Sequence, residues 1–299
     1  MRITQRMMTD NAVKYMDENL QRLYKLQEKV ASGKEFQRPS DNPSGVAAAF
    51  SLRSTLTTTQ AYLDSTAYTD SWMTTTDFSL NQMIQLATRA VNLTREGVSD
   101  TMGPDQRSAM ATEVDVILQQ VMNVANSNHQ GNYIFAGFQT QTPPYALADT
   151  NSDGRYDTVT YNGDNGIINR MLSPGLTVVQ NVNDNPSFQD LMQAIMFARD
   201  ALLSNDSAQI QAAVAPLENS LQKITELMTT NGARQRQVRL AKDRLEKAQI
   251  ELKSMISAKE DANMTEAISY LQHQQTVYQT VLEVGQRAIS AMSLFDLLS

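Results

Sequence analysis

Both ends of this chain carry apolar side chains at alternating spacings of three and four residues, and in each end the pattern stops at a defined point. Near the N-terminus the row runs from Met16 through Leu23 to Val30. Near the C-terminus one regular row fails at Lys259, and a second row begins in a new register at Met264. Such spacing predicts helices with a narrow apolar face, which need partner helices to bury it. A coiled coil between the two ends of the chain is the economical arrangement.

The N-terminal row stops at residues 32–43, Ser-Gly-Lys-Glu-Phe-Gln-Arg-Pro-Ser-Asp-Asn-Pro. Gly33 suits the C-terminal cap of a helix, and the two prolines push the residues before them toward extended conformations. We interpret this stretch as a fixed bend between a terminal helix and a helical body, although an ordinary loop between two helices has the same composition. Residues 260–263 interrupt the C-terminal rows in a similar way, and Asn263 with Glu266 suits the cap of the last helix.

The chain that follows the bend is predicted to form three helices. Apolar spacing predicts a first helix from the bend to about Trp72, a region that also holds two triplets of threonine, a weak helix former. Asp77 suits the cap of a second helix, which the stretch 97–103 ends. A third helix is predicted to begin at Pro104 and to stop at residues 126–131.

Residues 138–185 differ in composition from the predicted helices, because they are rich in Gly, Pro, Asn, Asp and Thr. The stretches 158–161 and 176–179 are predicted to be short strands, and Asn162-Gly163 is predicted to form a hairpin turn. We expect this β-rich insert to be exposed and dispensable for folding.

Helical spacing resumes at Ser187, and Pro216 is expected to kink or restart this part. Asn231-Gly232 is expected to form a turn. The predicted fold class is therefore mainly α, with long terminal heptad helices that form a coiled coil, a helical rod-like bundle and a small β-rich outer insert. The predicted domains are the terminal coiled coil of residues 1–35 with 262–299, the helical rod of 36–137 with 186–261, and the insert of 138–185.

Composition excludes several classes of function. A net charge of -7 argues against a nucleic-acid partner, which would need a concentrated basic face. The chain has no Cys, no apolar run near the ~20 residues of a membrane span, and no apolar core of a secretory signal peptide at its start. The common nucleotide, hydrolase and metalloprotease motifs are absent. We therefore expect no enzyme activity, no cofactor and no membrane partner, and we expect His129 and His273 to be solvated or structural.

One stretch has the ligand spacing of a calcium loop. Asp149, Asn151, Asp153 and Asp157 place oxygen atoms at the first, third, fifth and ninth positions, with a glycine at the sixth. However, Thr160 stands where the loop needs a bidentate Glu, and no predicted helix flanks the stretch. We interpret it as a turn rich in Asn and Asp, and a secreted calcium-dependent binding module is the alternative function of a different class.

A set of motifs in a fixed order resembles one family. Residues 26–34 followed by 39–43 resemble its Ser-Gly-Lys…Pro-Ser-Asp-Asp-Pro signature, with Asn42 in place of the second Asp. Residues 128–137 resemble a Gly-x-Tyr-x-Phe-x-Gly stretch that is typical of its hook–filament junction members and not of flagellin. Further matches are found at residues 2–4, 232–234, 260–263 and 293–298. The chain thus resembles the flagellin-like axial proteins of the bacterial flagellum.

The resemblance implies a secreted, extracellular structural subunit at the hook–filament junction, exported through the type III pathway of the flagellum. Its terminal helices would line an axial tube, and its insert would form an outer domain. The implied partners are further copies of the chain in a ring, the hook-side adapter protein (hook-associated protein 1), flagellin and an export chaperone. The alternative within the family is the filament subunit, flagellin itself.

The resemblance also implies that the apolar faces of the terminal helices pack against neighbouring subunits. Gln275 and Gly285 interrupt the C-terminal face, where they are expected to set register or to allow close approach. The residues expected at this assembly interface are Ile3, Met7, Leu20, Leu23, Leu26, Met264, Ile268, Leu271, Tyr278, Leu282, Ile289 and Met292.

Overall fold

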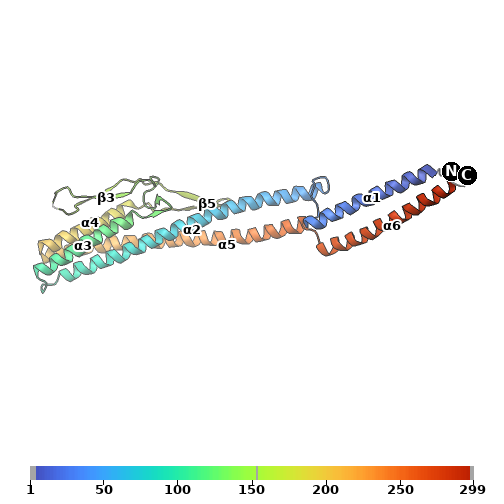
Figure 1. Cartoon of the computed structure of the whole chain (residues 1–299). Helices are drawn as coiled ribbons and strands as arrows, with labels where there is room; N and C mark the ends of the chain where they lie inside the picture. The colour runs from blue at the N-terminus through green and yellow to red at the C-terminus, as the bar shows by residue number, and fades with distance from the viewer. Residues whose placement is uncertain (1–4, 153, 297–299) are drawn as a thin grey trace. The chain divides into compact units, whose positions relative to one another are not determined.

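The computed structural model describes residues 5–152 and 154–296, and it confirms the mainly helical fold class (Figure 1). The helices are α1 (Gln5–Ser32), α2 (Pro43–Gly97), α3 (Pro104–Ala125), α4 (Asn185–Ser204), α5 (Ser207–Glu260) and α6 (Met264–Asp296). The strands are β1 (Asn128–His129), β2 (Asn132–Tyr133), β3 (Tyr145–Ala148), β4 (Thr158–Tyr161), β5 (Asn169–Ser173) and β6 (Leu176–Val179). No helix among these residues is long and apolar enough to cross a membrane.

The chain divides into two compact units, to which α2 and α5 both contribute. Unit 1 combines the residues up to Thr58 with those from Ala248 onward, and unit 2 is Thr59–Lys247. Unit 1 therefore holds α1, α6 and both predicted breaks in the helical pattern, which the structure confirms at residues 33–42 and 261–263. The division into three domains stays a prediction.

Helix α2 runs without interruption where the sequence predicts an end near Trp72 and a new start at Asp77. The hydroxyls of Thr74, Thr75 and Thr76 donate to backbone carbonyls four residues earlier, over 2.8, 3.2 and 3.0 Å. These bonds give the hydroxyls acceptors within the helix itself. Because Trp72 is 2% exposed and Met73 and Thr76 are fully buried, tertiary packing outweighs the weak local propensity.

Helix α5 likewise continues through Pro216, where the sequence predicts a kink or a restart, and through Asn231-Gly232, where it predicts a turn. Asn231 is buried, and its side-chain amide donates to the carbonyl of Met73 in α2 over 3.1 Å. Asn231, which favours a turn in isolation, thus forms a hydrogen bond between the two long helices α5 and α2. Leu217 and Ile224, which are fully buried, hold the same helix in the core.

The β-rich insert consists of two antiparallel hairpins, β3–β4 and β5–β6, and confirms the predicted strands. Asn162-Gly163 does not form the predicted hairpin turn, because β4 pairs with the preceding strand β3. The hairpin turn between β5 and β6 lies instead at Pro174-Gly175, where Gly175 has a φ of 78°. A proline followed by a glycine with positive φ is the signature of a type II turn.

The insert is not an exposed appendage, contrary to the expectation from its composition. Tyr145 and Val159 lie in the core cluster that contains side chains of α2, α3, α4 and α5. Leu172 and Val178 pack with Met73 and two residues of α5 in a second cluster. Thr160, Arg170 and Thr177 of these short strands are exposed, and they alternate with the few apolar side chains that join the helical core, so composition alone does not reveal the buried ones.

Candidate assembly interface

Helices α1 and α6 pack against each other as an antiparallel pair within unit 1 (Figure 1). Their direction follows from paired positions, because Lys34 of the first break pairs with Asp261 while Asn19 contacts Gln274 further along α6. The seam buries Leu23 and Ala267, which are 8% and 2% exposed. Five predicted interface residues are half-buried in this pair, namely Leu20, Leu26, Leu271, Tyr278 and Leu282.

A polar contact interrupts the apolar seam at its middle. The side-chain amide of Gln274 donates to the Oδ1 of Asn19 over 3.0 Å, and the amide of Asn19 donates to the carbonyl of Tyr15 over 2.7 Å. The predicted interrupting residue, Gln275, is exposed instead. Gly285, the second predicted interruption, is buried, and a Cβ there would lie 3.4 Å from the Sδ of Met16, which fits the predicted close approach.

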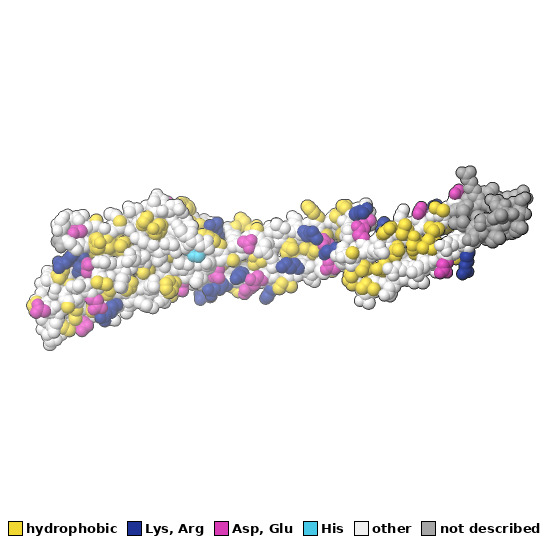
Figure 2. Space-filling model, viewed as in Figure 1, with side chains coloured by type: hydrophobic (Ala, Val, Ile, Leu, Met, Phe, Trp, Pro, Cys, Tyr) yellow, Lys and Arg dark blue, Asp and Glu magenta, His cyan; other side chains and the backbone are white. Residues whose placement is uncertain are grey.

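Apolar side chains also cover the outward surface of this helix pair (Figure 2). Met264 and Ile268 are 37% and 42% exposed, and Met7 is 57% exposed. Among the side chains that the structure describes, the other large exposed apolar residues of the pair are Val13, Tyr15, Tyr24, Tyr270 and Val284. Ile3 lies outside the described residues, and so do the side chains of Ile289 and Met292. The predicted face is thus divided between a part that meets the other helix and a part that faces solvent.

The two breaks in the helical pattern are joined by backbone hydrogen bonds, and together we call them the hinge (residues 33–42 and 261–263). The N–H of Glu35 donates to the carbonyl of Glu260 over 2.7 Å, and the N–H of Ala262 donates to the carbonyl of Gly33 over 2.9 Å. Gly33 has a φ of 68°, a conformation that favours glycine and ends α1. The two helical breaks therefore lie side by side, joined by these backbone hydrogen bonds.

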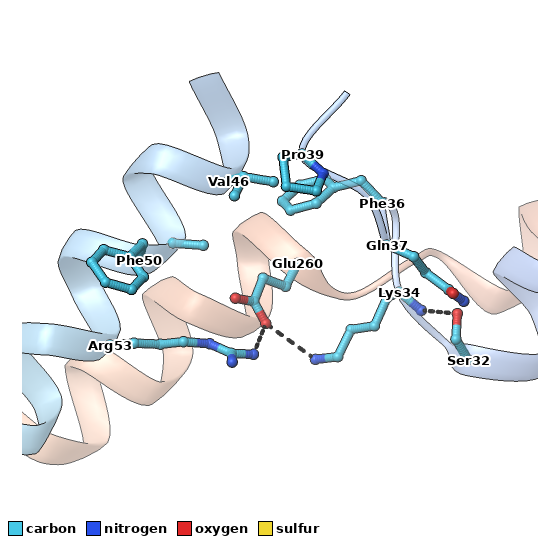
Figure 3. Close-up of a pocket in the computed structure, with 10 residues that line it drawn as sticks. Ser32, Lys34, Phe36, Gln37, Pro39, Val46, Phe50, Arg53 and Glu260 are labelled. Atoms are coloured by element: carbon cyan, nitrogen blue, oxygen red, sulfur yellow. Dashed lines mark hydrogen bonds and ion pairs between the residues drawn. The ribbon is translucent and has the colours of Figure 1, made fainter. Parts of the chain in front are cut away.

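Charged side chains reinforce the hinge (Figure 3). The carboxylate of Glu260, 8% exposed, accepts from the guanidinium of Arg53 over 2.6 Å and from the Nζ of Lys34 over 3.5 Å. The same Nζ donates to Asp261 over 2.6 Å. The hydrogen bonds from Lys34 and then from Ser257 lower the pKa of Asp261 below its ordinary value, and the bond to Asp261 raises the pKa of Lys34. Bonding to Glu260 likewise raises the pKa of Arg53.

A pocket of about 460 Å³ opens beside these charges (Figure 3). Its apolar lining comes from Phe36, Pro39, Val46 and Phe50, and Phe50 is 75% exposed. The cations of the pocket are already paired with carboxylates. The pocket thus combines an apolar lining with cations that are already bound to carboxylates.

Two residues of the candidate calcium loop, Asp149 and Asp157, accept hydrogen bonds inside the loop that connects β3 and β4. The Oδ2 of Asp149 accepts from the N–H of Gly154 over 2.9 Å. The carboxylate of Asp157 accepts from the N–H and the hydroxyl of Thr150 over 3.0 and 2.6 Å, and these bonds lower the pKa of Asp157. Asp153 lies outside the described residues, and Asn151 is exposed. Across the described part of the chain, no three His, Cys, Asp or Glu side chains could together hold a metal ion.

The motif at residues 128–137 has a packing role in unit 2. Ile134, Phe135 and Ala136 are at most 1% exposed, and Gly137 has a φ of 66° with the carboxylate of Asp164 directly against it. His129, 9% exposed, lies beside the hydroxyl of Thr75, which is 3.0 Å from its Nδ1. These residues hold the chain that enters the insert against the helices.

Sequence reasoning missed two buried arginines. Arg107 uses all its donors to bind the carbonyls of Gly97, Ser99 and Asn205, the side chain of Asn205 and the hydroxyl of Ser207. Arg199 binds Asp115, Asp200 and the carbonyl of Tyr156, and so ties the insert to α3 and α4. Because Arg is usually exposed, no sequence pattern marks these two as buried.

Comparison with known proteins now adds to this geometry. Residues 3–140 match the bacterial flagellin N-terminal helical region. Flagellar hook-associated protein 3 of Salmonella typhimurium is 26% identical over 62% of this chain and 59% of its own length. The protein of the same name from Escherichia coli is 28% identical over 49% of this chain and 46% of its own length. The aligned part thus spans about half of each curated relative.

The solved structure of Bacillus cereus FlgL has the same fold. The two chains are 22% identical, and the aligned part includes 69% of this chain and 99% of the Bacillus cereus chain. The TM-score is 0.60. At this identity the likeness concerns the fold alone. The sequence matches confirm the resemblance predicted from the motifs: the chain is similar to flagellar hook-associated protein 3, and its N-terminal part is similar to the flagellin N-terminal helical region.

Proposed function

We propose that this protein is a structural subunit of the junction between the flagellar hook and the filament. The observation that carries the proposal is the similarity to two proteins named flagellar hook-associated protein 3. The motif at residues 128–137 supports it, because the sequence pattern there resembles the junction members and not flagellin. On this proposal the protein acts outside the cell after export by the type III pathway, and it has no catalytic role.

The exposed apolar residues of α1 and α6 support a role in assembly. Isolated surface apolar residues need no explanation, but a patch that gathers on one helix pair is typical of a contact surface. We propose that this surface packs against neighbouring copies in a ring, and that the ring contacts hook-associated protein 1 on the hook side and flagellin on the filament side. An export chaperone would cover the same apolar face before secretion.

The second candidate function is that of a filament subunit. Its support is the match of residues 3–140 to the bacterial flagellin N-terminal helical region. The two functions differ in where the protein lies and in how many copies each flagellum holds.

The decisive experiment is the position of an epitope-tagged copy along the assembled flagellum, seen by immunogold electron microscopy. The tag belongs in the loop at residues 150–152, which is exposed and is not part of the terminal helices. A short band at the hook end supports the junction role, and label along the whole filament supports the flagellin role. Deleting the gene should leave hooks in place while flagellin monomers accumulate in the medium. Normal filaments without the protein would contradict both functions.

A further inference from the structure

Three Asn-Gly pairs occur in the chain, and the structure places them in different environments. In such a pair the glycine has no Cβ, so its backbone nitrogen can approach the asparagine side chain. The nitrogen attacks Cγ, the bond from Cγ to the side-chain nitrogen breaks, and ammonia leaves a cyclic imide. Water then opens the imide either to aspartate or to isoaspartate, in which the main chain runs through the former side-chain carbon.

Two of the pairs are held away from this reaction. Asn231-Gly232 lies inside α5, where Asn231 is 1% exposed and its side-chain amide donates to the carbonyl of Met73. Helical backbone also binds the attacking N–H of the glycine in the helix ladder. In Asn165-Gly166, the N–H of Gly166 donates to the Oδ1 of Asp164 over 2.8 Å, and the Gly166 carbonyl accepts from Asn181 over 2.8 Å.

The third pair, Asn162-Gly163, is open. Asn162 is exposed and follows the last residue of β4, and its own N–H donates to the carbonyl of Pro144 over 2.8 Å. Within the described part of the chain, the N–H of Gly163 donates to no acceptor. The attacking nitrogen is therefore free while the residue before it is anchored. We propose that Asn162 is a site of spontaneous deamidation in the folded protein.

The position gives the modification a structural consequence. The hydroxyl of Tyr161 donates to the carbonyls of Phe135 and Asp164 over 3.2 and 2.9 Å. The Oδ1 of Asp164 accepts from the N–H of Phe138 over 2.7 Å, and the N–H of Asp164 donates to the carbonyl of Ala136 over 3.2 Å. This network fixes residues 135–138, the end of the motif described above.

Gly163 lies close against this network, because a Cβ there would lie 2.9 Å from the carbonyl oxygen of Ala136. Isoaspartate at position 162 adds one carbon atom to the main chain immediately before Gly163. The added atom shifts Gly163 and Asp164 away from their partners. Deamidation through isoaspartate should therefore release residues 135–138, whereas conversion to ordinary aspartate changes only the charge.

The test is to age the purified full-length protein at mildly alkaline pH and to map its peptides by mass spectrometry with fragmentation that distinguishes isoaspartate. In the folded protein Asn162 should deamidate more than about tenfold faster than Asn231, whose reaction requires local opening of a buried helix. Asn165 should fall between them. In urea all three pairs should react at similar rates, because only the native structure separates them. Equal rates in the folded protein, or Asn165 reacting fastest, would overturn the proposal.

Hydrogen exchange tests the consequence. The amides of Phe138 and Asp164 should lose protection in aged wild-type protein in proportion to the isoaspartate content. Asn162→Asp should keep that protection, since it adds the charge without the extra backbone atom, and Asn162→Gln should prevent the loss on ageing. Isoaspartate at position 162 with unchanged protection of both amides would refute the structural part.

Discussion

The division of α6 into two faces leads to a test that separates assembly from folding. Met264 and Ile268 face solvent, whereas Leu271 and Leu282 are half-buried against α1. We expect the double variant Met264→Asp/Ile268→Asp to block assembly and to leave the monomer intact. Met264 begins α6, and acidic side chains near a helix N-terminus are favourable. The variant Leu271→Asp/Leu282→Asp should instead disrupt the α1–α6 pair within the monomer.

The exposed fractions of Met264 and Ile268 give the expected loss of binding free energy between subunits. Full burial of such a side chain contributes about 1.5–3 kcal/mol. With 37% and 42% still exposed, the two outward residues have about 1–2 kcal/mol between them to gain on assembly. Burying unpaired carboxylates in their place costs about 3 kcal/mol or more. The total of about 4–5 kcal/mol per subunit corresponds to at least about a thousandfold weaker contact.

The assay compares both variants in a strain that lacks the wild-type gene. Attached filaments and flagellin in the medium report assembly, and hydrogen exchange of the purified monomers reports the α1–α6 pair. The outward variant should release flagellin and keep wild-type protection in α6, and the inward variant should lose protection in α6. Retained filaments in the outward variant, or a loss of α6 protection in it, would refute the assignment of the two faces.

Four further predictions concern stability. Arg107→Met should lower the free energy of unfolding of unit 2 by about 3–5 kcal/mol in urea titrations, because the five acceptors bound by this buried guanidinium lose their donor, and Arg107→Lys should recover only part of it. The lowered pKa of Asp261 means that its bond to Lys34 stabilises the hinge above the ordinary carboxyl pKa of 3.8 and is lost as pH falls below it; Asp261→Asn should abolish this acid dependence of hinge amide exchange. Tyr145→Phe should leave the free energy of unfolding unchanged or raise it by up to about 1–3 kcal/mol, since the buried hydroxyl has no partner among the described residues. Replacing residues 138–185 with a Gly/Ser linker should lower the melting temperature of unit 2, and unchanged melting would show that the insert does not support the helical core.

Much of the fold was predictable because periodicity is a local property. The apolar spacing of three and four, with Gly33 and the prolines after it, located both breaks in the terminal helices and the caps beside them. The strands of the insert were equally local signals. The mainly α fold class and the family resemblance could therefore be obtained from the order of these features along the chain.

Other features depended on contacts between distant residues. Trp72, Asn231 and Pro216 lie in segments where local propensity favours an interruption, yet burial against other helices keeps α2 and α5 continuous. The two arginines buried in unit 2 bind carbonyls and carboxylates that are brought together only by folding. No pattern in the sequence identifies such acceptors, because they come from different segments.

The seam between α1 and α6 shows what the sequence determines and what only the folded structure determines. Helix α6 has apolar residues on two adjacent stripes that share Leu271, Tyr278 and Gly285, so a heptad repeat fits either stripe. The sequence by itself determined that α6 has an apolar face and needs partners. Only the tertiary structure decided that Gln274 rather than Gln275 meets α1, because the backbone bonds at the hinge fix where α6 starts and how it is rotated.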